Sequence, residues 1–191
     1  MLFRSAKEYL DKAVSVSLAI GARNIEAHAT SKLGSVFASV NDNEKAKEHY
    51  QKALTISREC GARGLEPTIY LNLGEFSRSL GEYVEAKDYL EKACSLSSQI
   101  GDKMCEFESF LSISMLKLAH SEIVNAKQHL LQCIGKYEQI RTSLKRNSEF
   151  KMSLLETHGS SPYQLLTVML WNTEKFQDAL YVQEQIGRAH V

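Results

Sequence analysis

The sequence predicts an all-α protein made of stacked antiparallel helix pairs, because three features recur at one fixed spacing. Small residues recur every 40 residues, helix-ending glycines recur at the same interval, and the apolar residues between them follow a helical period. The recurring positions are Ala6, Ala46, Ala86 and Ala126; Ala13, Ala53, Ala93 and Cys133; and Gly21, Gly61 and Gly101. Repetition at one offset along the chain indicates internal duplication.

The clearest copy runs from Pro67 to Glu106 and contains two amphipathic helices, which we name the first-type and the second-type helix in chain order. Pro67 suits a helix start, and Gly81 supplies a tight turn between the two helices. By the same pattern, helices are predicted over residues 5–20, 25–40, 43–59, 66–80, 83–99, 104–119 and 122–140. The helix over 5–20 is of the second type and lacks a first-type partner, so the array is expected to start in mid-repeat.

Second-type helices carry a small, a large and again a small residue on one face. In the copy at Ala46, Tyr50 and Ala53 the spacing is i, i+4 and i+7, which is one side of a helix. The alanines let a neighbouring backbone approach, and the large residue fills the remaining space. Gly61 then ends the helix, because glycine takes a left-handed conformation without steric cost.

First-type helices place a large apolar residue beside a glycine at Leu33-Gly34 and Leu73-Gly74. Glycine inside a helix costs about 1 kcal/mol relative to alanine, so a packing reason is expected. The sequence therefore predicts that the antiparallel partner helix packs directly on each glycine.

The pattern loosens after the second full copy. Ser112-Ile113-Ser114 replaces the Leu-Gly pair, and the 40-residue period breaks after Ile140. The extra residues fall in 141–161, where either a longer preceding helix or a short extra helix near 148–156 is expected. Pro162 then suits the start of a first-type helix, and a last second-type helix opens near Phe176.

These elements give one predicted array with six segments. The segments are 1–26 (leading half repeat), 27–66, 67–106 and 107–140 (repeats), 141–161 (insertion or extra helix) and 162–191 (last repeat, truncated).

Composition excludes several classes of protein. Lys+Arg and Asp+Glu both number 23, and this balance argues against a nucleic-acid groove, which needs clustered positive charge. The longest apolar run, 165–171, is far shorter than the roughly 20 residues that span a bilayer, and no secretory signal opens the sequence. The four cysteines form no paired motif, so reduced thiols and a cytoplasmic location are expected.

The sequence contains no motif typical of a catalytic, metal-binding or phosphate-binding site. None of the six histidines lies in a metal-ligand spacing, and Cys133 replaces an alanine at a crossing position, where a small core residue is expected. No glycine-rich loop follows a strand to bind phosphate. The sequence therefore predicts no catalytic residue, no metal site, no cofactor and no enzyme activity.

The repeat resembles the tetratricopeptide repeat (TPR). The residues that carry this resemblance are Tyr70, Leu73, Gly74, Tyr83, Ala86, Leu90 and Ala93. The resemblance implies a right-handed superhelix of about four repeats plus the leading half repeat, with about 9–10 helices and a concave face lined by first-type helices. The 40-residue length is similar to that of kinesin light chains and of the LGN/Pins adaptors. Residues 161–166 and 179–189 resemble the end of the array in CHAT-domain proteins of the tetratricopeptide repeat protein 28 group.

In this family partner segments lie on the concave face, and the resemblance implies a set of binding positions. These are His28, Ser31, Lys32, Ser35, Thr68, Leu71, Asn72, Glu75, Arg78, Glu108, Leu111, Ser112, Met115 and Leu118. The carboxylate clamp of chaperone-binding members is absent. Asn72 is either one rung of an asparagine ladder or a structural residue. Leu111, Met115 and Leu118 either form an apolar docking stretch or pack on segment 141–161.

The sequence thus favours a non-catalytic scaffold that binds a peptide or helix of another protein in its groove. The alternative is the regulatory TPR region of a protein whose CHAT domain lies beyond residue 191. A nucleic-acid-binding repeat is disfavoured by the neutral charge, and no membrane partner is expected. Apolar faces at the two uncapped ends predict self-association.

Overall fold

The computed structural model describes residues 2–144 and 162–189, and every regular element within these ranges is helical. The chain divides into two compact units, Met1–Ile100 and Gly101–Val191. The boundary lies at the turn after α5, inside the predicted repeat 67–106. None of the helices in these ranges combines the length and the apolarity that crossing a bilayer requires.

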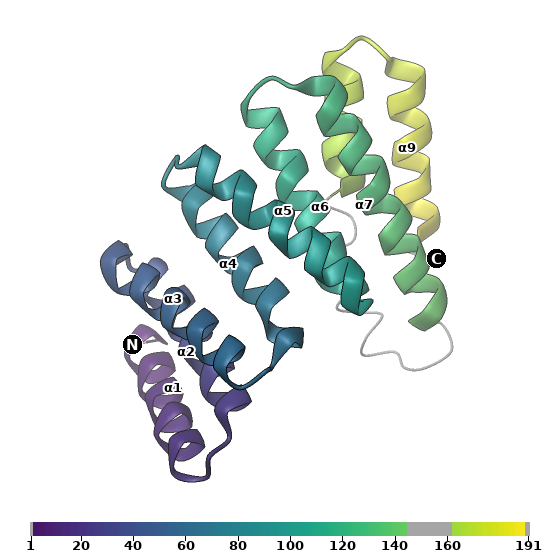
Figure 1. The fold of residues 1–191 in the computed structure, drawn as a ribbon. Coiled ribbons are helices and arrows are strands. Elements are labelled where there is room, and N and C mark those ends of the chain that lie inside the picture. Colours follow the sequence, from purple (N-terminus) through teal and green to yellow (C-terminus); the bar gives the residue numbers. More distant parts are fainter. Residues whose placement is uncertain (1, 145–161, 190–191) are drawn as a thin grey trace. The chain divides into compact units, whose positions relative to one another are not determined.

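The first unit contains two complete helix pairs preceded by a single helix (Figure 1). Its elements are α1 (Leu2–Ala19), α2 (Arg23–Ala38), α3 (Asn43–Glu59), a 3₁₀ turn η1 (Arg63–Leu65), α4 (Glu66–Ser79) and α5 (Tyr83–Ile100). These helices confirm the predicted ones, the largest difference being the start of α1, while η1 was not predicted. The pairs are α2 with α3 and α4 with α5, and α2 packs against α1.

The second unit contains a third pair, α6 (Lys103–Ala119) and α7 (Ile123–Leu144), followed by a helix over residues 162–172 and α9 (Phe176–Ala189). The helix start predicted at Pro162 is confirmed, as is the last helix from Phe176. α7 runs four residues beyond the predicted end at Ile140, which agrees with the alternative of a longer helix. The alternative of an extra helix near 148–156 lies outside the described residues.

Helices end at left-handed residues placed every 20 residues along the first two-thirds of the chain. These residues are Gly21, Asn41, Gly61, Gly81, Gly101 and Ser121. At Gly61, with φ of 69°, the next amide donates back into the helix, from Ala62 N to Ser57 O at 2.9 Å. Glu122 N makes the equivalent bond to Lys117 O at 2.9 Å beside Ser121. Each of these bonds joins an amide to the carbonyl five residues earlier and so pairs a carbonyl that the helix end would leave free. The prediction that left-handed glycines end the helices is therefore confirmed.

Replacing Ser121 with glycine is expected to raise the free energy of unfolding of the second unit by about 0.5–1 kcal/mol. Ser121 has φ of 58°, a conformation that costs a residue with a side chain about 1–2 kcal/mol. Glycine avoids this steric cost, and the larger backbone entropy that glycine loses on folding cancels only part of the gain. The reverse change, Gly101→Ser, places a side chain at φ of 75° with no atom within 4 Å of its Cβ, so it is expected to cost about 1 kcal/mol. Urea denaturation of both variants measures these effects, and equal shifts of the same sign would contradict them.

The two glycines inside the first-type helices, Gly34 and Gly74, lie at helix crossings, as predicted. A Cβ added to Gly74 would lie 2.6 Å from Leu90 Cγ, and one added to Gly34 would lie 2.8 Å from Tyr50 Cδ1. These distances are too short for any side chain, so the glycines allow the paired helices to approach. In the third pair Ser114 takes this place, is fully buried, and donates its hydroxyl to Phe110 O at 2.6 Å.

The small residues predicted at the crossings of the second-type helices α3, α5 and α7 form the core. They are Ala46, Ala53, Ala86, Ala93, Ala126 and Cys133, each with no exposed surface. In the second unit two apolar clusters continue this core into the last two helices, one around Tyr137 and Tyr163 and the other around Leu130 and Leu166.

Thr30 is a buried residue of α2 whose hydroxyl oxygen has no hydrogen-bond partner among the described residues. A buried hydroxyl without a partner carries an unrecovered desolvation penalty of about 1–3 kcal/mol. Thr30→Val removes that hydroxyl and is expected to raise the free energy of unfolding of the first unit by about 1 kcal/mol. Thermal denaturation measures the effect, and a lower melting temperature would show that the hydroxyl is bonded.

Candidate partner-binding surface

The structure places the residues predicted on α2 in two different environments. His28 and Lys32 are exposed, whereas Ser31 keeps only 3% of its surface. Ser35 is half-buried and accepts a hydrogen bond from the Tyr50 hydroxyl at 3.1 Å. The exposed row on α2 therefore runs through His28 and Lys32, and Ser31 faces the inside of the unit.

Asn72 on α4 ties the two first-type helices of the first unit together. Its Nδ2 donates to Ser31 Oγ at 3.2 Å, although the two residues lie 41 positions apart. This hydrogen bond favours the structural role over the asparagine ladder, since the Asn72 side-chain amide that would bond a partner's backbone donates to Ser31 of the same unit.

The remaining residues predicted on α4 are partly engaged. Arg78 Nη2 lies 2.6 Å from Glu75 Oε2, so each of the two charges is paired with the other one turn away. Thr68 is half-buried, and Leu71 keeps 6% of its surface. The accessible part of α4 is therefore Thr68 and the Glu75–Arg78 pair.

On α6 of the second unit, the residues predicted as an apolar docking stretch mostly face the core. Leu111 and Leu118 pack against the cluster around Leu130 and Leu166. Met115 is exposed, as is Glu108. Ser112 keeps 7% of its surface. The contacts of Leu111 and Leu118 with residues 145–161 lie outside the described residues.

Three predicted binding residues therefore need correction, because Ser31, Leu71 and Ser112 are buried by their own units. Adjacent residues on a helix point about 100° apart, so a continuous run such as 31–32 or 71–72 cannot all face a partner. Assignment of the other residues to a partner site stays a prediction.

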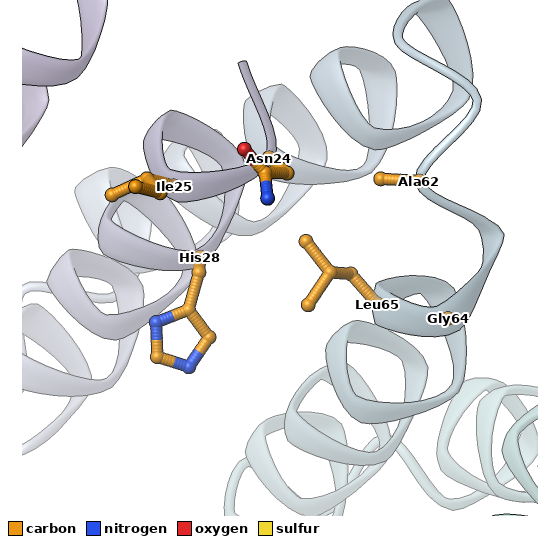
Figure 2. Close-up of a pocket in the computed structure, with 6 residues that line it drawn as sticks. All are labelled: Asn24, Ile25, His28, Ala62, Gly64 and Leu65. Carbon is orange, nitrogen blue, oxygen red and sulfur yellow. The ribbon is translucent and has the colours of Figure 1, made fainter. Parts of the chain in front are cut away.

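A pocket of about 450 Å³ opens beside the exposed row, between the start of α2 and η1 (Figure 2). It is lined by Asn24, Ile25, His28, Ala62, Gly64 and Leu65. Ile25 and Leu65 occupy equivalent places in successive repeats and supply apolar walls, while Asn24 and His28 supply polar edges. Of these residues only His28 was predicted from the sequence, and η1, which carries Gly64 and Leu65, was not predicted.

The first turn of α2 beside this pocket is held by charge pairs. Arg23 Nη1 lies 2.7 Å from Glu26 Oε2, and Arg23 Nη2 lies 2.6 Å from Glu59 Oε2 on α3. Glu26 is buried, and its place in the first turn suits the positive end of the helix dipole. The Arg23–Glu59 pair therefore links the first turn of α2 to the end of α3.

The part of the chain that the structure describes holds no group of three His, Cys, Asp or Glu residues placed to bind a metal ion. Burial raises the pKa of Cys133 to about 12, so its thiol stays protonated at neutral pH and is a poor nucleophile. Its sulfur lies 3.5 Å from Phe107 O, as suits a small core residue.

Comparison with known proteins agrees with a helical repeat. Two solved structures share the fold at low sequence identity: BtubC (BKLC) from P. vanneervenii and PilF from Pseudomonas aeruginosa. The first has 17% identity and a TM-score of 0.75, covering 98% of this chain and 73% of the other. The second has 17% identity and a TM-score of 0.63, covering 99% of this chain and 78% of the other. They confirm the predicted all-α, TPR-like fold.

No curated protein sequence matches the chain significantly. The two structures and the matching family do not name a CHAT domain, so the alternative based on that domain gains no support. The family model of the soluble NSF attachment protein, SNAP, matches residues 3–186, which is nearly the whole sequence. The chain therefore belongs to the soluble NSF attachment protein family.

Proposed function

We propose that this chain is a non-catalytic adaptor that binds a peptide or helical segment of another protein along the exposed row of α2 and the half-buried residues Thr68, Glu75 and Arg78 of α4. The observation that carries the proposal is the apolar-walled pocket beside the exposed row of α2, in a chain whose family is named for attachment to a protein. Ligand sites combine apolar walls with a few polar groups that fix orientation, and this pocket has both.

The surface suits a protein segment better than a small molecule. The pocket is open and continues into His28 and Lys32 on the surface of α2. An apolar side chain of a partner segment would occupy the pocket that Ile25 and Leu65 help to line, as anchors of docked helices and extended peptides do. The next part of the segment would pass Thr68 and the Glu75–Arg78 pair on α4.

A binding titration with purified NSF tests the proposal, since NSF is the partner that the family description names. Ile25→Asp puts a charge into the pocket wall, and Lys32→Glu reverses a charge in the exposed row. Each is expected to weaken binding about tenfold or more, because hot-spot residues in apolar pockets cost over 1.4 kcal/mol when disrupted.

Two matched variants on second-type helices serve as controls. Val84→Asp and Lys52→Glu make the same chemical changes at exposed positions of α5 and α3. They are expected to leave the affinity within about twofold of the original chain. If the control variants lost as much affinity for NSF as the α2 variants, the binding surface would not be on α2 and α4. If the original chain did not bind NSF, NSF would not be the partner.

A further inference from the structure

The pocket between the start of α2 and η1 carries two polar side chains that have no bonding partner within the chain. Asn24 and His28 line the pocket, and neither side chain makes a hydrogen bond, ion pair or ring contact with another described residue. The two residues lie four positions apart, which places them on one face of the helix. The amide and the imidazole are therefore both free to bond a group that enters the pocket.

The remaining side chains of the pocket are apolar. Ala62 and Leu65 line it from the side of η1, and Ile25 lies next to Asn24 with 49% of its surface exposed. Figure 2 shows the side chains of Asn24 and Leu65 turned toward the same space, with His28 one turn further along α2. A side chain that enters this space therefore meets both apolar surface and groups that form hydrogen bonds.

The pocket offers no partner of fixed charge. No Asp, Glu, Lys or Arg is among the described residues that line it. The carboxylates of Glu26 and Glu59 are both paired with Arg23, at 2.7 and 2.6 Å. An uncharged polar group therefore suits the pocket better than an ammonium or a carboxylate, which would lose water without gaining an ion pair.

Helix packing does not account for the amide and the imidazole. Residues that packing requires recur every 40 positions, as the first-turn glutamates Glu26, Glu66 and Glu106 do. Asn24 and His28 do not recur, since positions 64 and 104 hold glycine and methionine, and positions 68 and 108 hold threonine and glutamate. The polar pair therefore belongs to this pocket and not to the repeat.

We infer that the pocket binds the side chain of a tyrosine from the partner segment, and that Asn24 and His28 determine this preference. The inference rests on the proposed function, and it narrows the anchor to an apolar ring with a polar tip. The phenol ring lies against Ile25 and Leu65. Its hydroxyl donates to Asn24 Oδ1 and accepts from an imidazole N–H of His28, since a phenol can do both.

Other large uncharged side chains make fewer bonds in this pocket. Leucine or phenylalanine would cover the amide and the imidazole without bonding them, and this costs affinity because both groups lose hydrogen bonds to water. Tryptophan has an N–H that donates but cannot accept, so it bonds only one of the two groups.

Probes that mimic single side chains test the inference on the full chain, without NSF. p-Cresol represents tyrosine, and toluene represents phenylalanine. NMR spectra of the chain labelled at its isoleucine and leucine methyl groups follow Ile25 and Leu65. p-Cresol is expected to shift both resonances saturably and to bind about fivefold more tightly than toluene, because it alone forms hydrogen bonds.

A double variant locates the preference in the two polar residues. Asn24→Ala combined with His28→Leu removes both polar groups, and is expected to bind p-cresol about fivefold more weakly and toluene with unchanged affinity. Asn43→Ala combined with His120→Leu makes the same changes at exposed positions outside the pocket. This control is expected to keep the original preference, and circular dichroism checks that both variants stay helical.

Three results would overturn the inference. p-Cresol causes no saturable shift of Ile25 and Leu65; toluene binds the original chain as tightly as p-cresol does; or the variant without Asn24 and His28 keeps the preference for p-cresol. These results do not depend on the NSF titration. If the chain bound p-cresol as expected but did not bind NSF, the pocket would keep its preference for tyrosine and only NSF would be excluded as the partner.

Discussion

Replacing Lys136 with methionine is expected to lower the free energy of unfolding of the second unit by about 2–3 kcal/mol. Lys136 Nζ on α7 lies 2.6 Å from Glu106 Oε1 in the first turn of α6, and Glu106 keeps only 6% of its surface. Removing one partner of a buried pair costs about 3–5 kcal/mol, because the other charge stays buried alone. Water partly reaches Lys136 itself, so the expected loss of about 2–3 kcal/mol lies at or below the lower end of that range.

A double variant distinguishes the free energy lost with the ion pair from the cost of leaving the Glu106 carboxylate buried without a partner. Lys136→Met with Glu106→Gln removes both charges, and is expected to recover most of the lost stability. Lys87→Met is the matched control, since Lys87 and Glu91 form an exposed pair at 3.9 Å, where a loss below about 0.5 kcal/mol is expected. Denaturant unfolding would contradict this reasoning if Lys136→Met cost as little as Lys87→Met.

Replacing Gly74 with alanine is expected to lower the free energy of unfolding of the first unit by about 1–3 kcal/mol. The new Cβ would lie 2.6 Å from Leu90 Cγ and 3.3 Å from Ala86 O, so α4 and α5 must move apart or Leu90 must leave its rotamer. This cost exceeds the gain of about 1 kcal/mol that alanine brings to a helix interior.

Gly135 supplies the opposite case. It lies inside α7, is exposed, and a Cβ built on it meets no atom within 4 Å. Gly135→Ala is therefore expected to stabilise the second unit by about 1 kcal/mol. If both alanine variants stabilised the chain, the close approach of the helices at Gly74 would be refuted.

The helices and their pairing could be predicted from sequence because the packing rule is local and repeated. In α5, Leu90 and the backbone of Ala86 lie against Gly74 of α4, and the residue types that this close packing requires can be recognised in the sequence. The turn positions were predictable for the same reason, since left-handed residues favour glycine. Asn41 and Ser121 depart from that preference: the turns at these positions were predicted from the helix pattern, but the left-handed conformation of the two residues was not.

The candidate binding surface could be predicted only in part. His28 and Lys32 are exposed, but Ser31 and Leu71 are buried, since one residue along a helix changes its direction by about 100°. The ion pair of Glu106 with Lys136 was also missed, because it depends on how one helix of a pair lies against the other. A pattern read along one chain segment does not contain that information.

The family relationship was not visible in the repeat pattern either. Residues at helix crossings, such as Gly34 and Gly74, are determined by how closely the helices pack. Different families of helical repeat proteins share this packing requirement. Partner choice depends on the exposed side chains between them, which no packing rule determines.

Hydrogen–deuterium exchange of the chain, with and without bound NSF, tests the proposed adaptor function most directly. The proposal predicts slower exchange of backbone amides in residues 24–35 and 64–78, which contain the exposed row and the pocket, and unchanged exchange in α3 and α5. Slower exchange confined to α3 and α5, with residues 24–35 and 64–78 unaffected, would contradict it.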